Sequence, residues 1–395
     1  MKASVSQLAA TLNERFENML LDLDTAIVMA GKKTDAMKML EDSEQGNRRR
    51  ELLLMEEVAQ KRREVEAKET QSMLAEVEAE FHLSLIADLR EQFQNPEYVF
   101  TEIMEFHPAM GRLLDVLYTE ACSISMLEEC VEQIPWLKKA LIRFVKQPKY
   151  ERLDSDGNPL VIESARGALS FVGIESLRLL LPALIAKKSL PPNNEYLPQL
   201  LEHLWEYTLG SGKATQVLAE KEGLKWFFGY NLGLMSTLGR SAIARMYLKA
   251  FDDKVIEKVT EARNLNNPTQ AQLLTELKPS ATYLISFWQR YANRLSLDLI
   301  ELMKFKRLAI QVGIEDYVRI KEVSIKAVDK ANLHPLTRVL FQSQGYMQFK
   351  MMKNHGLLSK QASMLYLRNF GIRSEDVVQL SKVNLTSLEV KVAES

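Results

Sequence analysis

The chain is poor in cysteine, glycine and proline, and it has no long apolar run. Cys122 and Cys130 are its two cysteines, and their spacing does not form a CxxC motif. A disulfide framework and a cysteine-rich metal site are therefore not expected. The first residues lack the apolar core of a signal peptide. These features predict a cytoplasmic protein with reduced thiols. A chain of 395 residues can bury a sizeable core without disulfides or metals, so its stability requires no cofactor.

Neither charge nor hydropathy favours a membrane or a nucleic acid as the partner. Lys and Arg number 51 and Asp and Glu 52, which gives a net charge of −1 with the histidines neutral. Proteins that bind nucleic acids or membrane surfaces normally carry a basic excess. A transmembrane helix needs about 18 or more apolar residues in succession, and the best candidate, residues 177–186, contains Arg178 and Pro182. We therefore expect no membrane contact and give nucleic-acid binding little weight.

The residues that are abundant favour helices. Leu, Glu, Lys, Ala and Met dominate, whereas Gly and Pro number 16 and 12 in 395 residues. The abundant types lose little side-chain freedom in a helix, and Gly and Pro interrupt helices. The composition predicts an all-α fold.

Breaks in the helical pattern divide the chain into four parts. The predicted parts are an N-terminal helical unit (1–46), a long amphipathic helix (47–94), a succession of short helices (95–302) and a C-terminal helical region (303–395). Asn95-Pro96 is the predicted end of the long helix. The C-terminal region is rich in Lys and Met. Its methionines at helical spacing predict core packing, and an exposed, adaptable recognition surface is the alternative.

The long helix of residues 47–94 has two interpretations. Its apolar residues recur mostly every four or seven positions between dense charges, which predicts one long amphipathic helix or two abutting ones. One interpretation is a connector that packs one stripe on the rest of the protein. The other is a coiled-coil arm for dimerisation. The stripe lapses near Arg62 and Lys68, which favours the connector.

Two strings resemble ligand-binding loops without completing them. Residues 210–215 read GSGKAT, like the end of a phosphate-binding loop, but Tyr207 and Ala214 stand where that motif needs its first glycine and its hydroxyl. We predict that this string lies inside a helix and that its glycines allow close helix contact. Residues 154–159 begin like a calcium loop but lack the closing acidic ligand, so we predict a surface turn there.

The sequence pattern offers no catalytic grouping. The five histidines are scattered, and no two lie three or four positions apart. His203 is predicted to be a hydrogen-bonded structural residue, whereas His107 and His334 precede prolines and are predicted to lie in turns. There is no G-x-S-x-G nucleophile motif. These patterns therefore predict neither a catalytic residue nor a metal ligand.

Three stretches of the central part follow one another in a characteristic order. They are residues 161–180 (VIESARGALSFVGIESLRLL), 204–219 (LWEYTLGSGKATQVLA) and 227–239 (FFGYNLGLMSTLG), with a weaker fourth at 283–288 (YLISFW). In order and spacing they resemble the HDOD domain, a helical output domain related to the HD metal-dependent phosphohydrolases. The resemblance covers about half the chain, from residue 98 to residue 302. It implies an HD-like multi-helix domain in which Gly173 ends a helix.

The positions that bind a metal in HD enzymes hold other residues here. In those enzymes a histidine–aspartate doublet binds the metal that activates water. The matching positions are Ser236 and Thr237, and Tyr207 matches an upstream histidine. The resemblance therefore implies a non-catalytic domain that has lost its metal ligands. Tyr207, Ser236 and Thr237 mark a vestigial pocket, which either binds a small ligand of unknown identity or is merely filled by these side chains.

Three hypotheses on function follow. The first, implied by the resemblance, is a bacterial, non-enzymatic regulatory protein that acts in signal transduction by binding other proteins, with self-association included. The second is a divergent metal-dependent phosphohydrolase that uses His203 and nearby carboxylates. The third is a nucleic-acid-associated regulator that uses the lysines of residues 138–139, 187–188 and 350–353.

Overall fold

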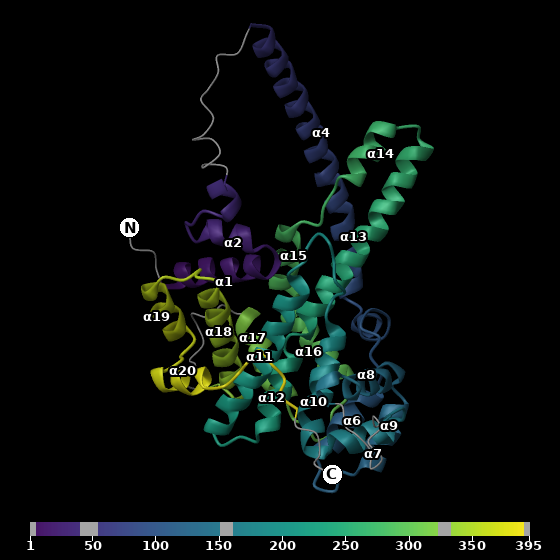
Figure 1. Ribbon diagram of the computed structural model, residues 1–395, viewed down its shortest axis with the longest axis vertical. Coiled ribbons are helices and arrows are strands. Elements are labelled where there is room, and N and C mark those ends of the chain that lie inside the picture. The colour runs from purple at the N-terminus through teal and green to yellow at the C-terminus, as the bar shows by residue number, and fades with distance from the viewer. Residues whose placement is uncertain (1–4, 40–53, 151–160, 323–332, 391–395) are drawn as a thin grey trace.

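The computed structural model describes residues 5–39, 54–150, 161–322 and 333–390 (Figure 1). Within these ranges the chain folds into helices and turns with no strand, which confirms the predicted all-α class. The surface turn predicted at residues 154–159 lies outside the described residues.

The N-terminal residues form two short helices, α1 (Val5–Leu21) and α2 (Leu23–Met29). α1 places an apolar stripe against the rest of the protein, and Leu12, Phe16 and Met19 of this stripe are buried. Residues spaced by three, four and seven positions share one face of a helix. Burial of this face holds α1 on the body of the molecule (Figure 1).

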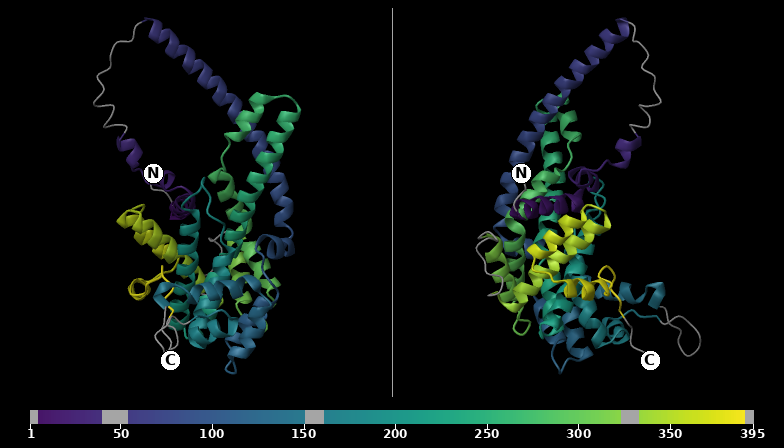
Figure 2. Two further views of the ribbon diagram at one scale, coloured as in Figure 1. Left: turned by 45° about the vertical axis from the view of Figure 1, so that its right-hand side comes forward. Right: turned by 90° about the vertical axis from the view of Figure 1, so that its left-hand side faces the viewer.

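Residues 54–93 form one helix, α4 (Leu54–Phe93). At about 1.5 Å per residue it is roughly 60 Å long, and its N-terminal part extends beyond the body of the molecule (Figures 1 and 2). Its C-terminal part packs on α13 (Leu238–Asn264) and α14 (Pro268–Thr275), where the ring centroids of Phe81 and Phe251 are 5.2 Å apart. The predicted long helix is confirmed over residues 54–93, and residues 47–53 of the prediction lie outside the described residues. Its C-terminal part packs as a connector would, and the dimerisation alternative stays a prediction.

The central part is a succession of helices that share an apolar core with the flanking parts. Besides α13 and α14 it contains α5 (Pro96–Tyr98), η1 (Val99–Ile103), α6 (Ala109–Leu117), α7 (Ile124–Glu132), α8 (Pro135–Val145), η2 (Pro148–Tyr150), α9 (Ala165–Val172), α10 (Ile174–Ser189), α11 (Leu200–Lys221), α12 (Trp226–Met235), α15 (Ala281–Phe287), η3 (Trp288–Ala292) and α16 (Asn293–Leu302). Gly173 separates α9 from α10 with a φ of +77°, so the predicted glycine C-cap is confirmed.

Among the described helices none is by itself long and apolar enough to cross a membrane. The pair α9 and α10 reaches the required length and apolar content only when its two helices are counted together, and it is bent by 116°.

The C-terminal part packs on the central helices. It consists of α17 (Gln311–Glu322), α18 (Pro335–Asn354), α19 (Lys360–Asn369) and α20 (Ser374–Ser381). α18 lies against α11, and its Met351 and Met352 are buried, so the predicted core role of these methionines is confirmed. His334 precedes α18, and its Nδ1 accepts a hydrogen bond from the Leu336 backbone N–H at 3.2 Å. His334 is therefore the N-cap residue of α18, which corrects the predicted turn to a helix cap.

The GSGKAT string lies inside α11, as predicted. A Cβ atom on Gly210 would fall 2.2 Å from Met347 of α18, and a Cβ on Gly212 would fall 2.8 Å from Leu234 of α12. Glycine therefore allows the two neighbouring helices to approach α11. Lys213 of the same string donates hydrogen bonds to main-chain carbonyls that follow α20. The string thus serves helix packing and attachment of the C-terminal segment.

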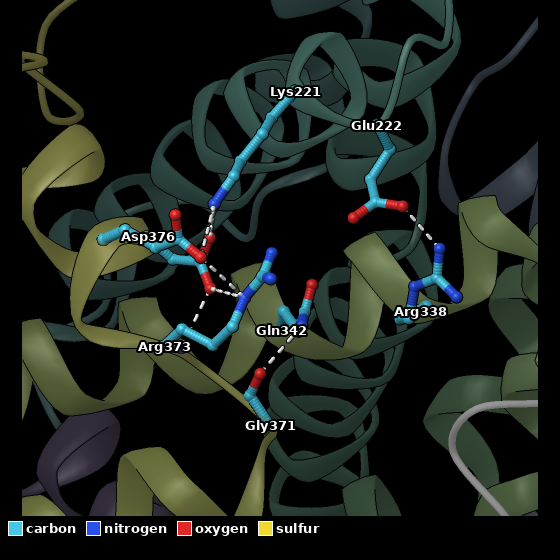
Figure 3. Close-up of polar contacts among 8 residues, drawn as sticks. Lys221, Glu222, Arg338, Gln342, Gly371, Arg373 and Asp376 are labelled. Atoms are coloured by element: carbon cyan, nitrogen blue, oxygen red, sulfur yellow. Dashed lines mark hydrogen bonds and ion pairs between the residues drawn. The ribbon is translucent and has the colours of Figure 1, made fainter.

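Ion pairs join the C-terminal helices to the end of α11 (Figure 3). Lys221 Nζ lies 2.5 Å from Asp376 Oδ1 of α20. Arg338 Nη2 of α18 lies 2.5 Å from Glu222 Oε2. The C-terminal part is therefore attached to the central part both by the apolar core and by charges at its edge.

Candidate functional site

Tyr207, Ser236 and Thr237 line one cavity. Tyr207 lies on α11, and Ser236 and Thr237 form the junction between α12 and α13. The cavity has a volume of about 290 Å³. The structure therefore brings together the three positions that the sequence comparison selected.

The hydroxyls of Ser236 and Thr237 already have hydrogen-bond partners. Ser236 Oγ donates to the Gly233 carbonyl at 2.8 Å and accepts from Gln344 Nε2 at 2.9 Å. Thr237 Oγ1 donates to the Leu234 carbonyl at 2.9 Å. A neutral hydroxyl engaged in this way is a weak candidate for a divalent metal ligand. These two side chains close the helix junction and tie it to α18.

Tyr207 is held by a chain of polar side chains. Gln348 Nε2 donates to Tyr207 Oη at 3.4 Å, and Tyr366 Oη donates to Gln348 Oε1 at 2.5 Å. Burial raises the pKa of Tyr207, so its phenol is neutral at physiological pH. Tyr207 therefore adds a neutral oxygen and an aromatic face to the cavity wall.

An arginine–glutamate pair lies beside these positions. Arg240 Nη2 donates to Glu17 Oε1 at 3.2 Å, and Gln289 Nε2 donates to Glu17 Oε2 at 2.9 Å. The Arg240 guanidinium lies over the Trp288 ring, 4.6 Å from the ring centroid. The side chains of Arg240 and Glu17 are only 15% and 10% exposed. The cavity therefore contains one buried cation whose charge is balanced by one carboxylate from α1.

Neither member of this pair was predicted from the sequence. Arg240 follows Thr237 by three positions, about one helical turn, and so lies on the same side of α13. That spacing could have identified Arg240 as a residue of the same site. Glu17 lies 223 residues before Arg240, and no local pattern connects the two.

Three parts of the chain meet at the cavity. Its wall is formed by Ala10, Asn13, Phe16 and Glu17 of α1, Tyr207 of α11, Ser236, Thr237 and Arg240 at the α12–α13 junction, Trp288, Gln289, Ala292 and Asn293 of η3 and α16, and Tyr317, Gln344 and Gln348 of α17 and α18. Among these described residues Glu17 is the one carboxylate, and the wall includes neither histidine nor cysteine. The N-terminal unit and the C-terminal region thus complete a cavity that begins in the central part.

His203, the ligand considered for a metal site, lies outside this wall. It packs against His355, with ring centroids 5.7 Å apart. Burial lowers the pKa of His355, and electrostatic repulsion from His203 lowers it further by a smaller amount. In the described ranges no group of three or more His, Cys, Asp or Glu side chains is placed to hold a metal ion. The contact between these two histidines could not be predicted from their separation in the sequence.

Two of the three lysine clusters considered for nucleic-acid binding lie at one groove. Residues 138–139 belong to α8 and residues 187–188 to α10, whereas residues 350–353 lie on α18. The groove has a volume of about 310 Å³. It is lined by Trp136, Lys139, Ala140, Arg143, Leu184, Lys187 and Lys188, and we call it the basic groove.

The cations of the basic groove differ in their partners. Lys188 is ion-paired with Glu105 at 2.7 Å. Lys139, Arg143 and Lys187 are exposed and form no ion pair within the described part of the chain. Lys187 also lies over the Trp205 ring, with its Nζ 5.5 Å from the ring centroid. The basic groove therefore combines three exposed cations with the apolar side chains of Trp136 and Leu184.

Comparison with known proteins identifies the central helices. They fall in a class of helical domains related to the HD family. Residues 103–290 match the HDOD domain, so the chain carries an HDOD domain, as predicted from the sequence. The match lies within the predicted central part, residues 95–302. No curated protein and no solved structure matched the chain.

Proposed function

We propose that this protein is a non-enzymatic, cytoplasmic regulatory protein of a bacterial signalling system and that it acts by binding other proteins. The lining of the cavity at the α12–α13 junction carries this proposal. The HD enzymes place their metal ligands at the equivalent positions. Here Ser236, Thr237 and Tyr207 supply neutral oxygens, and the one carboxylate, Glu17, is paired with Arg240.

This set of side chains is a poor host for a divalent metal. A catalytic metal site normally offers three imidazole or carboxylate ligands and an open position for water. A metal in this cavity would compete with Arg240 for Glu17 and would lie beside a fixed positive charge. The same side chains suit a cavity that holds helices together or receives an organic ligand.

The basic groove is the surface that we propose for the protein partner. Its three exposed cations, Lys139, Arg143 and Lys187, form no ion pair with the described residues and complement an acidic segment. Trp136 and Leu184 offer apolar contact to a side chain of that segment. The groove is short, and the net charge of the whole chain is −1. These two facts favour an acidic protein segment over a nucleic acid, which needs a longer track of cations.

The absence of catalysis is tested on untagged protein purified without chelators. We expect mass spectrometry to find far less than one transition metal per chain, and we expect no hydrolysis of phosphodiester or nucleotide substrates with added Mn²⁺ or Mg²⁺. A stoichiometric metal together with hydrolysis that is lost in His203→Ala would favour the phosphohydrolase alternative instead.

The partner surface is tested with a triple variant, Lys139→Glu, Arg143→Glu and Lys187→Glu. The matched control carries Lys278→Glu, Lys360→Glu and Lys382→Glu, which are exposed and lie outside the groove. A fluorescent acidic peptide with one central leucine should bind the native chain and the control equally and the groove variant about tenfold more weakly. Tighter binding to DNA of equal charge, with steep salt dependence, would point to a nucleic-acid partner and contradict this assignment.

A further inference from the structure

We propose that the cavity between α1, the α12–α13 junction and α18 is a binding site for a small oxyanion, a carboxylate or a phosphate. Arg240 is the residue that binds the oxyanion, and Glu17 is an internal carboxylate that occupies Arg240 when the ligand is absent. This site goes beyond the protein-binding function and does not depend on it.

Arg240 has too few partners for a buried guanidinium. An arginine carries five N–H donors in a planar fork and prefers a bidentate carboxylate or phosphate. Only one Glu17 oxygen, Oε1, accepts a hydrogen bond from Arg240, and the donor is Nη2. The other oxygen, Oε2, accepts a hydrogen bond from Gln289. Arg240 Nη1 is buried and makes no hydrogen bond. Nη1 is closed to solvent in the arrangement described, so a ligand oxygen can satisfy this donor only when the Glu17–Arg240 pair opens and the guanidinium turns toward the cavity.

The guanidinium is held in a fixed orientation. It lies over the Trp288 ring, and its Cζ is 6.0 Å from the centroid of the Tyr207 ring. The Trp288 indole N–H donates to the Arg240 backbone carbonyl at 2.9 Å, which fixes the ring on which the guanidinium rests. A positive charge that is oriented before the ligand arrives loses less entropy on binding.

The size of the cavity limits the ligand to a small molecule. A volume of about 290 Å³ equals roughly ten water molecules. The amide side chains of Asn13 and Asn293 also line the wall, and amides can donate to or accept from the polar part of a metabolite. A small organic acid or a phosphate ester therefore suits both the volume and the lining.

Glu17 distinguishes this site from a passive cavity. Its carboxylate is the group that a ligand oxyanion must displace or join at Arg240. Removal of the Glu17 charge should therefore strengthen oxyanion binding, whereas removal of the Arg240 fork should weaken it. Glu14 supplies the matched control, because it lies on the same helix, is exposed and is outside the cavity wall.

The test is calorimetric titration of the full chain with sodium phosphate and, separately, with sodium acetate, each against sodium chloride at matched ionic strength. We expect at least one of the two anions to bind with a stoichiometry of one. Arg240→Gln should weaken that binding about tenfold or more, Glu17→Gln should strengthen it several-fold, and Glu14→Gln should leave it unchanged. Preference for phosphate or for acetate identifies the oxyanion class.

Two outcomes would overturn the proposal. One is the lack of saturable binding of either anion to the native chain and to Glu17→Gln. The other is binding that Arg240→Gln leaves unchanged, which would assign the anion to another surface such as the basic groove. If Arg240→Gln does not fold, as judged by circular dichroism, Arg240→Lys keeps the charge but lacks the fork and should still weaken binding several-fold. Metal content, hydrolysis and peptide binding, measured on the same preparations, report on the proposed function separately.

Discussion

His82 is a neutral imidazole enclosed by aromatic rings. Its side chain is 1% exposed, and its ring centroid lies 4.6 Å from that of Tyr283 and 6.3 Å from that of Phe251. Neither ring nitrogen makes a hydrogen bond, and the nearest carboxylate oxygen, on Glu78, is 3.8 Å from Nε2. Burial lowers the pKa of His82 to about 4. The folded protein therefore keeps this histidine uncharged under conditions in which the unfolded chain would protonate it.

This difference predicts a pH-dependent loss of stability. The ordinary pKa of histidine is about 6.5, so the unfolded state gains a proton first, and stability is lost as the pH falls from about 6.5 to about 4. The loss should reach up to about 3 kcal/mol. His82→Phe should remove this component, so urea unfolding of both proteins at several pH values should show a difference that grows in that window. A difference that stays constant from pH 8 to pH 4 would contradict the assignment.

The residues whose roles could be predicted are those whose roles show in the sequence immediately around them. Gly173 was predictable because a positive φ at a helix end selects glycine, and Met351 because its helical spacing indicates a buried face. Arg240 and Glu17 were missed because their pairing depends on how α1 crosses the central helices. A contact across more than 200 residues has no signature in periodicity or spacing.

At the scale of elements, α20 is held on the molecule by a buried carboxylate. Asp376 is only 3% exposed, and it accepts hydrogen bonds from Lys221 Nζ and from the Arg373 backbone N–H at 2.8 Å (Figure 3). Burial raises the pKa of Asp376, but the hydrogen bonds and charges of Lys221 and Arg373 outweigh burial and lower it overall. The neighbouring Glu375 also faces Lys221, at 3.6 Å, but is 60% exposed.

The two acidic residues of α20 should therefore differ in their contribution to stability. Asp376→Asn should lower the free energy of unfolding at pH 7 by about 1–3 kcal/mol, because a buried charged hydrogen bond is lost. Glu375→Gln should change it by less than about 0.5 kcal/mol, since exposed ion pairs contribute little. The Asp376 contribution is present above its ordinary pKa of about 3.9 and is lost as the pH falls through the lower folded value. Denaturant unfolding at pH 7 and pH 3 checks this prediction, and equal effects of both substitutions would refute it.

Helix periodicity predicted where helices form, but it did not predict which helices pack against one another. The long helix α4 and the helix that contains Gly210 were expected from the sequence, because an uninterrupted run without Gly or Pro, or a continuous apolar face, is a local property. The partner of each face was not predictable. Gly210 meets Met347 of α18, and nothing in the sequence around either residue indicates that α11 and α18 are neighbours.

On the scale of the whole molecule, the flanking parts pack on the HDOD domain through large side chains. Phe16 of α1 meets Tyr207 with ring centroids 5.1 Å apart, and Phe81 of α4 meets Phe251 at 5.2 Å. These contacts belong to one continuous apolar core. The domain that the family comparison outlines, residues 103–290, therefore lacks part of its packing when it is isolated.

Deletion of residues 1–94 should consequently destabilise the remaining chain. The deletion uncovers Tyr207 and Phe251, and full burial of one large apolar side chain contributes about 1.5–3 kcal/mol. Several such losses should lower the melting temperature by about 10 °C or more and increase the binding of a hydrophobic dye. A control substitution, Glu14→Gln, changes an exposed residue of α1 and should melt like the native chain. If the deletion variant melted at the native temperature and stayed monodisperse, the N-terminal helices would be an independent arm. If it melts early, partner binding must be mapped with substitutions such as those in the basic groove, because a deletion would change the fold and the binding surface together.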